Sequence, residues 1–180
     1  MNTYVLTHTK HTGLLAEFAE RFEKYWGEPF FVYVSNTDIQ HWSDGVLNFL
    51  RSIQDEYLIL LHEDFYLTKP VDKELLKKLK EEAVKRGVSR MSLLGNHSPE
   101  RTYGIDTEFY SHHADAPYVF SLEASIQKRQ FLLDNLKGGC NPWDAENGRL
   151  GKAKGLVLYS KEPAIFYQDK MRQGNYETVI

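Results

Sequence analysis

Three ionisable residues directly follow the most apolar run of the sequence. Residues 57–61 read Tyr-Leu-Ile-Leu-Leu and lead straight into His62, Glu63 and Asp64. The apolar run predicts a buried strand in mid-sheet, and open parallel sheets bind ligands at the carboxyl ends of their strands. If the strand persists, His62 and Asp64 share one face and could hold a divalent cation against a diphosphate leaving group. A solvated strand end with a capping acid is the structural alternative.

A second group of polar and aromatic residues follows Gly138 and Gly139. Residues 141–147 read Asn-Pro-Trp-Asp-Ala-Glu-Asn. Proline and acids are favoured in the first turn of a helix, so this stretch predicts a short helix, and that role alone would explain the acids. The functional alternative is a carboxylate that takes the proton of an acceptor hydroxyl, while Trp143 packs against a sugar ring.

Alternating strand and helix patterns must position these two groups. Strands are expected over residues 4–7, 30–34, 57–61 and 91–94, and helices over 14–26, 42–53 and between Asp72 and Gly87. Later strands are expected over 118–123, 156–159 and 164–167, with a helix face over 131–136 and a long loop over 95–117. This order is typical of parallel α/β sheets. We expect one domain over residues 1–180, of the α/β class, a three-layer sandwich with a mostly parallel central sheet.

Composition and charge argue against several classes of protein. A net charge of -3 and a pI near 6.2 leave no basic field for a nonspecific grip on nucleic acid. Cys140 is the only cysteine, so no intrachain disulfide can form and a reducing compartment is expected. The sequence shows no signal-peptide pattern and no apolar run long enough for a membrane span, which predicts a cytoplasmic protein. Walker, dinucleotide-binding and nucleophile-elbow motifs are missing.

The order and spacing of these motifs resemble those of bacterial and viral GT-A glycosyltransferases. The resemblance rests on Trp42 and on residues 57–67, 121–126 and 141–146. It implies a nucleotide-diphospho-sugar transferase fold and the transfer of a sugar from a nucleotide-sugar donor. In this family an Asp-X-Asp motif or a variant of it binds Mn²⁺ or Mg²⁺ and the donor diphosphate. Asp64 resembles the last acid of that motif, and His62 stands where the first is expected.

The same resemblance implies roles for further residues. Inverting members take their catalytic base from a Trp-rich segment that ends in an acid, which implies Glu146 as base, Asp144 as second candidate, and Trp143 on the acceptor side. A further metal ligand near the C-terminus is implied at Asp169, with Lys170 and Arg172 available to phosphates. The residues expected to border the donor are Thr7, His8, Asn36, Asp38 and Glu63.

Two other functions stay open on the sequence. A nucleotidyltransferase would use the same acid to hold a metal against a nucleoside triphosphate, although its usual Gly-rich, Lys-bearing N-terminal loop is missing. A non-catalytic sugar- or nucleotide-binding module is compatible with His62 in place of an acid and with the short chain. The acceptor is expected to be a glycan or another hydroxyl-bearing molecule. A local basic patch of Arg149, Lys152 and Lys154 leaves a nucleic-acid acceptor open.

Overall fold

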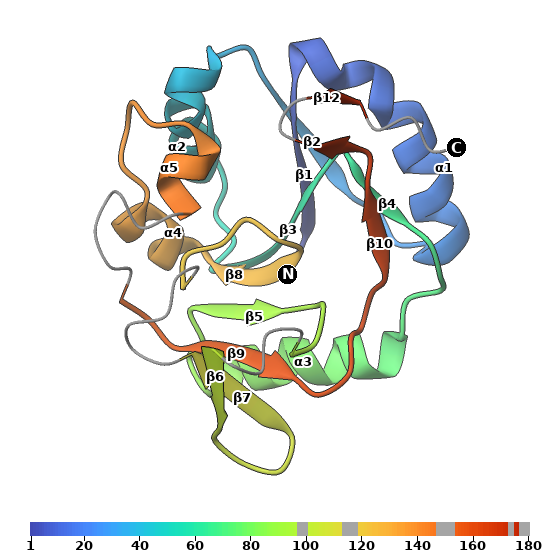
Figure 1. The fold of residues 1–180 in the computed structure, drawn as a ribbon, viewed down its shortest axis with the longest axis vertical. Helices are drawn as coiled ribbons and strands as arrows, with labels where there is room; N and C mark the ends of the chain where they lie inside the picture. Colours follow the sequence, from blue (N-terminus) through green and yellow to red (C-terminus); the bar gives the residue numbers. More distant parts are fainter. Residues whose placement is uncertain (97–100, 113–118, 147–153, 173–174, 177–180) are drawn as a thin grey trace.

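The computed structural model places a central eight-stranded sheet between two layers of helices (Figure 1). It describes residues 1–96, 101–112, 119–146, 154–172 and 175–176. The strands of this sheet are β1 (Thr3–His8), β2 (Phe31–Ser35), β3 (Tyr57–His62), β5 (Arg90–Ser92), β6 (Thr102–Gly104), β7 (Phe109–His112), β8 (Ser125–Lys128) and β9 (Val157–Ser160). Their order across the sheet is β2-β1-β3-β8-β5-β9-β7-β6. The strand pairings make β7 and β8 antiparallel to the other six, so the sheet is mixed but mostly parallel.

Helices cover both faces of the sheet. They are α1 (Leu15–Tyr25), α2 (Trp42–Ser52), α3 (Lys73–Lys85), α4 (Arg129–Asn135) and α5 (Pro142–Glu146), with 3₁₀ turns η1 (Thr9–Leu14) and η2 (Ile39–His41). The apolar residues of α1 and α3 pack into one core cluster, and those of α2, α4 and α5 into the other. The predicted three-layer α/β architecture is therefore confirmed. No helix in the described ranges has the length and apolar character needed to cross a membrane.

Strand β3 is apolar along its length because it is buried on both faces. Ile59 and Leu61 belong to the core cluster of α1 and α3, whereas Leu58 and Leu60 belong to that of α2 and α4. Since neighbouring side chains of a strand point to opposite faces, a strand covered on both sides must be apolar throughout. β3 lies between β1 and β8, which confirms the mid-sheet position predicted from its composition.

Two short two-stranded sheets complete the fold. β4 (Phe65–Leu67) pairs with β10 (Tyr167–Asp169), and β11 (Met171–Arg172) pairs with β12 (Asn175–Tyr176). Figure 1 shows β10 running beside β4, which directly follows β3 in the chain. The last part of the chain therefore returns to the carboxyl end of the central strand.

Three predictions about later elements are wrong. The strand expected over 118–123 begins only at Ser125, where the chain enters between β3 and β5. The strand expected over 164–167 lies at 167–169, because the amide groups of Ala164 and Ile165 bond instead to Leu93 O, at 2.9 and 3.2 Å. The segment expected as a loop over 95–117 contains the hairpin of β6 and β7, an extension of the sheet beside β9.

Helix α2 approaches the end of β2 closely at Gly45, which gives a test of the packing. A Cβ atom at Gly45 would lie 2.5 Å from Ser35 Oγ and 2.9 Å from Thr37 Oγ1, two atoms that hydrogen-bond each other at 2.7 Å. We expect Gly45→Ala to lower the free energy of unfolding by about 1–2 kcal/mol in urea denaturation. Gly13→Ala is the control, because its Cβ would meet no atom within 4 Å. Equal stability of the two variants would contradict this packing.

Candidate active site

The strand β3 ends at His62, and the chain turns at once into β4. Leu6 of β1 pairs with His62, so the polar residues after β3 lie beside the carboxyl end of β1. The strand does not continue to Asp64, because the backbone N–H of Tyr66 donates to Asp64 O at 3.0 Å in a tight turn. The alternation predicted for His62 and Asp64 therefore does not apply. Their position at the carboxyl edge of the sheet is as predicted.

The ring of His62 is held in an apolar environment. It lies edge-on to the Phe65 ring with centroids 5.3 Å apart, and its Nε2 atom is buried without a hydrogen-bond partner in the described ranges. Burial lowers the pKa of His62 to about 4, so the imidazole is neutral at pH 7. Neutral imidazole is the form that ligates metal ions, and an unpaired buried nitrogen is costly. His62 therefore has the protonation state of a metal ligand, although its Nε2 is enclosed by the protein.

The pairing of β10 with β4 brings Asp169 next to Asp64. Asp169 lies opposite Phe65 in this pairing, and the backbone N–H of Lys170 donates to Asp64 O at 3.0 Å. Asp64 is half-buried and Asp169 is exposed. Mg²⁺ sites in nucleotide enzymes commonly use one or two carboxylates and complete their shell with substrate phosphates and water. In the described ranges no three His, Cys, Asp or Glu side chains form a metal-binding group, so any shell at Asp64 would depend on such added ligands.

Of the two basic residues predicted to bind the donor phosphates, the structure describes the side chain of Lys170 but not that of Arg172. The Nζ atom of Lys170 lies 5.3 Å from the centre of the Tyr66 ring and 4.0 Å from a carboxylate oxygen of Glu17 on α1. Lys170 is therefore turned toward α1. Arg172 lies in β11, and its side chain is outside the described part of the molecule, as are Arg149 and Lys152 of the basic patch.

Thr7 and Glu63 form a buried pair at the ends of β1 and β3. Glu63 is 5% exposed, and the hydroxyl of the nearby Thr7 donates to His8 O at 3.4 Å. Burial, reinforced by the charge of Asp64, raises the pKa of Glu63 to about 7. His11 Nδ1 lies 3.5 Å from Glu63 Oε1. These contacts turn Glu63 into the protein, which does not favour the donor contact predicted for it.

The other residues predicted to border the donor lie on the loop after β2 or contact it. His8 Nε2 donates to Thr37 O at 2.9 Å, because its Nδ1 accepts the backbone N–H of Lys10 at 3.0 Å. Asp38 caps η2 with its side chain, and Asn36 is exposed. His8 thus joins the ends of β1 and β2, and Asn36 is the member of this group that is free of a structural role in the described contacts.

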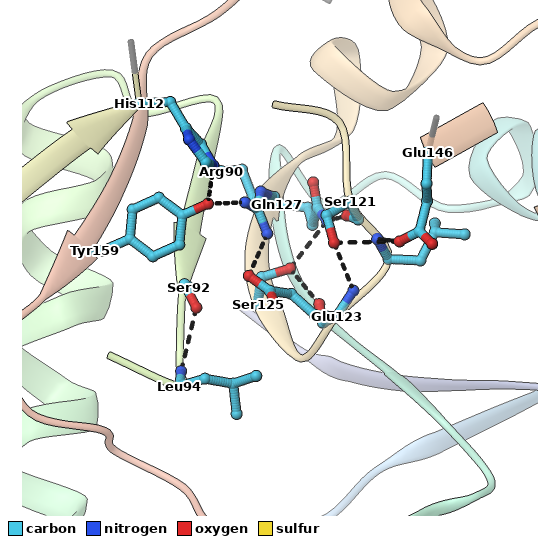
Figure 2. Close-up of polar contacts among 11 residues, drawn as sticks. Arg90, Ser92, Leu94, His112, Ser121, Glu123, Ser125, Gln127, Glu146 and Tyr159 are labelled. Carbon is cyan, nitrogen blue, oxygen red and sulfur yellow. Dashed lines mark hydrogen bonds and ion pairs between the residues drawn. The ribbon is translucent and has the colours of Figure 1, made fainter. Parts of the chain in front are cut away.

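Helix α5 places Glu146 against the turn that precedes β8. Glu146 Oε1 accepts the backbone N–H of Leu122 at 2.6 Å and the hydroxyl of Ser121 at 3.1 Å (Figure 2). Burial raises the pKa of Glu146 above its ordinary value, although these two hydrogen bonds and the charge of Arg90 oppose that effect. A half-buried carboxylate with a raised pKa suits general-base chemistry near neutral pH.

The two other residues of this motif have different environments. Asn141 Nδ2 donates to Asp144 Oδ2 at 2.8 Å, and the backbone N–H of Asp144 donates to Asn141 Oδ1 at 2.9 Å. This reciprocal arrangement is a helix cap, so Asp144 has the structural role expected of an acid at a helix start. Trp143 is 44% exposed on the same helix. Glu146 is therefore the better candidate for a base, and Trp143 is accessible for ring packing.

A buried polar network lies beside Glu146 and was not predicted from the sequence. Arg90 on β5 is 1% exposed, and its Nη1 donates to Glu123 Oε1 at 2.6 Å. Its other terminal nitrogen hydrogen-bonds the hydroxyl of Tyr159, which also contacts His112 Nε2 (Figure 2). Burying a charged group is expensive unless it is paired, so this network fixes the side chains it joins. It ties β5, β7 and β9 to the turn that holds Glu146.

The sequence contains a signal for this network. Arg90 pairs with Gln127 and Ser92 with Ser125, so four polar residues share one face of β5 and β8. The apolar residues between them face the opposite side, as an alternating pattern requires. Polar residues at every second position of these two strands give the centre of the sheet a buried polar face. Such a face is unusual in a core that only stabilises the fold.

Comparisons with known proteins show the fold. No family model matches the chain, and no curated protein is similar in sequence. The crystal structure of S. aureus TarS 1-349 is similar with a TM-score of 0.56 and 13% identity over 94% of this chain and 61% of that one. Its complex with UDP-GlcNAc gives a TM-score of 0.56 and 15% identity over 98% and 60% of the two chains. The crystal structure of UDP-glucose pyrophosphorylase complexed with UDP-glucose gives a TM-score of 0.53 and 12% identity over 89% of this chain and 72% of that one.

These similarities confirm the predicted α/β fold with a mostly parallel central sheet. At such identities they concern the fold alone. The chain spans about three fifths of the length of the TarS structures that it matches.

Ser121 and Glu123 act on the carboxyl of Glu146 with opposite signs. Ser121→Ala removes a hydrogen bond that stabilises the carboxylate, so the pKa of Glu146 should rise. Glu123→Gln removes a nearby negative charge and leaves the charge of Arg90 in place, so the pKa should fall. Carbon-13 NMR titration of the glutamate carboxyls measures both shifts, with Glu146→Gln to assign the signal.

The control is Ser52→Ala, whose hydroxyl bonds to the backbone of α2 and should leave the Glu146 titration unchanged. Shifts of the same sign in the Ser121 and Glu123 variants would contradict the geometry described here.

Proposed function

We propose that the protein is a metal-dependent glycosyltransferase that moves a sugar from a nucleotide-sugar donor to a hydroxyl group of an acceptor. One observation carries the proposal: the pairing of β10 with β4 sets the segments of Asp64 and Asp169 side by side at the carboxyl edge of the sheet, while Glu146 lies on α5 with its carboxylate held by Ser121 and Leu122. The fold of TarS, solved with UDP-GlcNAc, and of UDP-glucose pyrophosphorylase, solved with UDP-glucose, supports a nucleotide-sugar donor.

Mn²⁺ or Mg²⁺ would be held by Asp64, and phosphate oxygens of the donor and water would complete its shell, since the described side chains do not form a three-ligand group. Asp169, on the strand that pairs beside Asp64, is the second carboxylate that could approach the ion. The ion would neutralise the charge that develops on the diphosphate as the bond to the sugar breaks. We assign the nucleoside to the loops at the ends of β1 and β2, where His8 and Asn36 lie.

Glu146 would act as the base. Its Oε1 is held by Ser121 and Leu122, so Oε2 is the atom that receives the proton of the acceptor hydroxyl. The oxygen of that hydroxyl then bonds to the anomeric carbon while the bond from that carbon to the diphosphate breaks. Attack from the side opposite the leaving group inverts the configuration of the sugar. Trp143, exposed on the same helix, would pack against a ring of the acceptor.

Nucleotidyl transfer is the second candidate, favoured by the similarity to UDP-glucose pyrophosphorylase. That reaction would join a sugar phosphate to a nucleoside triphosphate and release pyrophosphate. In this chain the segment after β1 is the turn η1, which contains a single glycine, Gly13. Release of pyrophosphate from UTP and glucose 1-phosphate would favour this function over sugar transfer, which releases UDP.

The first test of the proposal concerns the metal and the donor. A ligand that binds only the folded protein raises its stability, by about 2.7 kcal/mol at a hundredfold excess over Kd. We expect UDP-GlcNAc or UDP-glucose to raise the melting temperature with Mn²⁺ and not with a chelator, and Asp64→Asn to abolish that rise. Asp134→Asn on the exposed face of α4 is the matched control and should keep it. A rise that is independent of metal in the wild type would refute the metal assignment.

The second test concerns the base. Glu146→Gln should lower the rate of UDP release in the presence of acceptor by about 10²- to 10⁴-fold, since that is the usual contribution of a general base. The melting-temperature rise with donor and Mn²⁺ should be unchanged. Asp144→Asn, which alters the cap of α5, should keep the rate within a few fold of wild type. Normal turnover by Glu146→Gln would remove Glu146 from the reaction.

A further inference from the structure

Helix α5 is too short to hold its own position. It has 5 residues, whereas isolated helices below about 12–15 residues are marginal in water, so its place depends on contacts with the rest of the fold. At its end Glu146 Oε1 accepts the backbone N–H of Leu122 at 2.6 Å. In its middle Ala145 packs in the core cluster that contains the apolar residues of α2 (Figure 1). The contacts at its beginning also decide where Glu146 lies.

Ser43, in the first turn of α2, exchanges two hydrogen bonds with Cys140, just before α5. The backbone N–H of Ser43 donates to Cys140 O at 3.1 Å, and the backbone N–H of Cys140 donates to Ser43 Oγ at 3.0 Å. Ser43 is 0% exposed and Cys140 is 5% exposed. The first N–H groups of a helix have no partner within it, and this exchange satisfies one of them. Breaking either bond would leave a buried polar group without a partner, which is costly.

Asp44, the next residue of α2, holds the preceding residue of the same segment. Its Oδ1 accepts the backbone N–H of Gly139 at 3.2 Å, and its Oδ2 hydrogen-bonds His41 Nδ1 at 3.1 Å. A Cβ atom at Gly138 would lie 2.7 Å from Asp44 Oδ1, so the backbone passes close to the carboxylate. Ser43 and Asp44 together form a clamp on residues 138–140.

The clamp is joined directly to α5. Asn141 follows Cys140 and caps the helix, since its Oδ1 accepts the backbone N–H of Asp144 at 2.9 Å. A shift of Cys140 would therefore move the helix as a unit. Trp143 and Glu146, the two residues of α5 assigned to the acceptor and to the base, would move with it.

We propose that Ser43 and Asp44 are positioning residues that hold the proposed base Glu146 in place through residues 138–140. The inference rests on the proposed function. A base must lie within hydrogen-bond reach of the hydroxyl that it deprotonates, and a displacement of about 1 Å can cost about a hundredfold in rate. The metal site is assigned to Asp64 on another part of the sheet edge. Donor binding should therefore not depend on the clamp.

Ser43→Ala is the direct test, because it removes the oxygen that accepts the Cys140 N–H. NMR hydrogen exchange should show the Leu122 N–H, which donates to Glu146, exchanging about 3- to 10-fold faster than in wild type, the usual worth of one hydrogen bond. The Leu76 N–H in α3, which donates to Asp72 O at 2.8 Å, should exchange as before. Ser52→Ala, the matched control at the far end of α2, should change neither rate.

Activity gives the second readout. With Mn²⁺, the release of UDP from UDP-GlcNAc or UDP-glucose to water should be about 10-fold slower in Ser43→Ala. The rise in melting temperature with the same donor should be unchanged. Asp44→Ala should slow the release in the same way. Asp44→Asn should release UDP at nearly the wild-type rate, because its amide oxygen can still accept the Gly139 N–H.

Each outcome bears on a different part of the inference. If the Leu122 N–H exchanges at the wild-type rate in Ser43→Ala, the clamp does not hold Glu146. If that exchange is faster while UDP release is normal, the clamp only stabilises the fold. Equal loss of activity in Asp44→Asn and Asp44→Ala would remove the role of the Gly139 bond. If the wild type neither binds nor hydrolyses these donors, the proposed function itself fails and the positioning role falls with it.

Discussion

The burial of β3 on both faces is the constraint on which the rest of the structure depends. A strand between two helical layers must be apolar along its whole length, so its first polar residue marks the edge of the sheet. His62 is that residue, and the turn after it sends the chain into β4. β4 supplies the edge on which β10 pairs, and that pairing carries Tyr167 and Asp169 to the end of β3. The candidate site thus follows from one buried strand and the segment that returns to it.

Burial affects two glutamates in the same direction but leaves them with different roles. It raises the pKa of Glu63 and of Glu146. Glu63 is enclosed by Thr7 and His11 and is turned away from a ligand. Glu146 is anchored through its Oε1 by Ser121 and Leu122, and the base role proposed for it uses the other oxygen. A raised pKa therefore identifies a base only together with the contacts of the carboxyl group.

The parts of the fold that the sequence predicts are those governed by local patterns. Both-sided burial makes β3 apolar, and Asp72 caps α3 by accepting the N–H of Leu75. The start of β8 was missed because Ser125 and Gln127 face the buried network, so the strand lacks the apolar pattern on which the prediction relied. The buried network around Arg90 and the stacking of Tyr167 on Phe65 depend on contacts between residues far apart in the chain, which spacing alone does not encode. The roles of Glu146 and Asp169 were expected from the resemblance to GT-A enzymes. The structure shows which residues surround them.

A crystal structure of the protein with UDP and Mn²⁺ tests the central claim most directly, because the anomalous signal of manganese locates the ion independently of the protein atoms. The account predicts the ion about 2.0–2.2 Å from a carboxylate oxygen of Asp64, with the diphosphate bound to it at the carboxyl ends of β1 and β3. A nucleotide bound at another part of the protein, or bound at this edge with no ion beside Asp64, would contradict it.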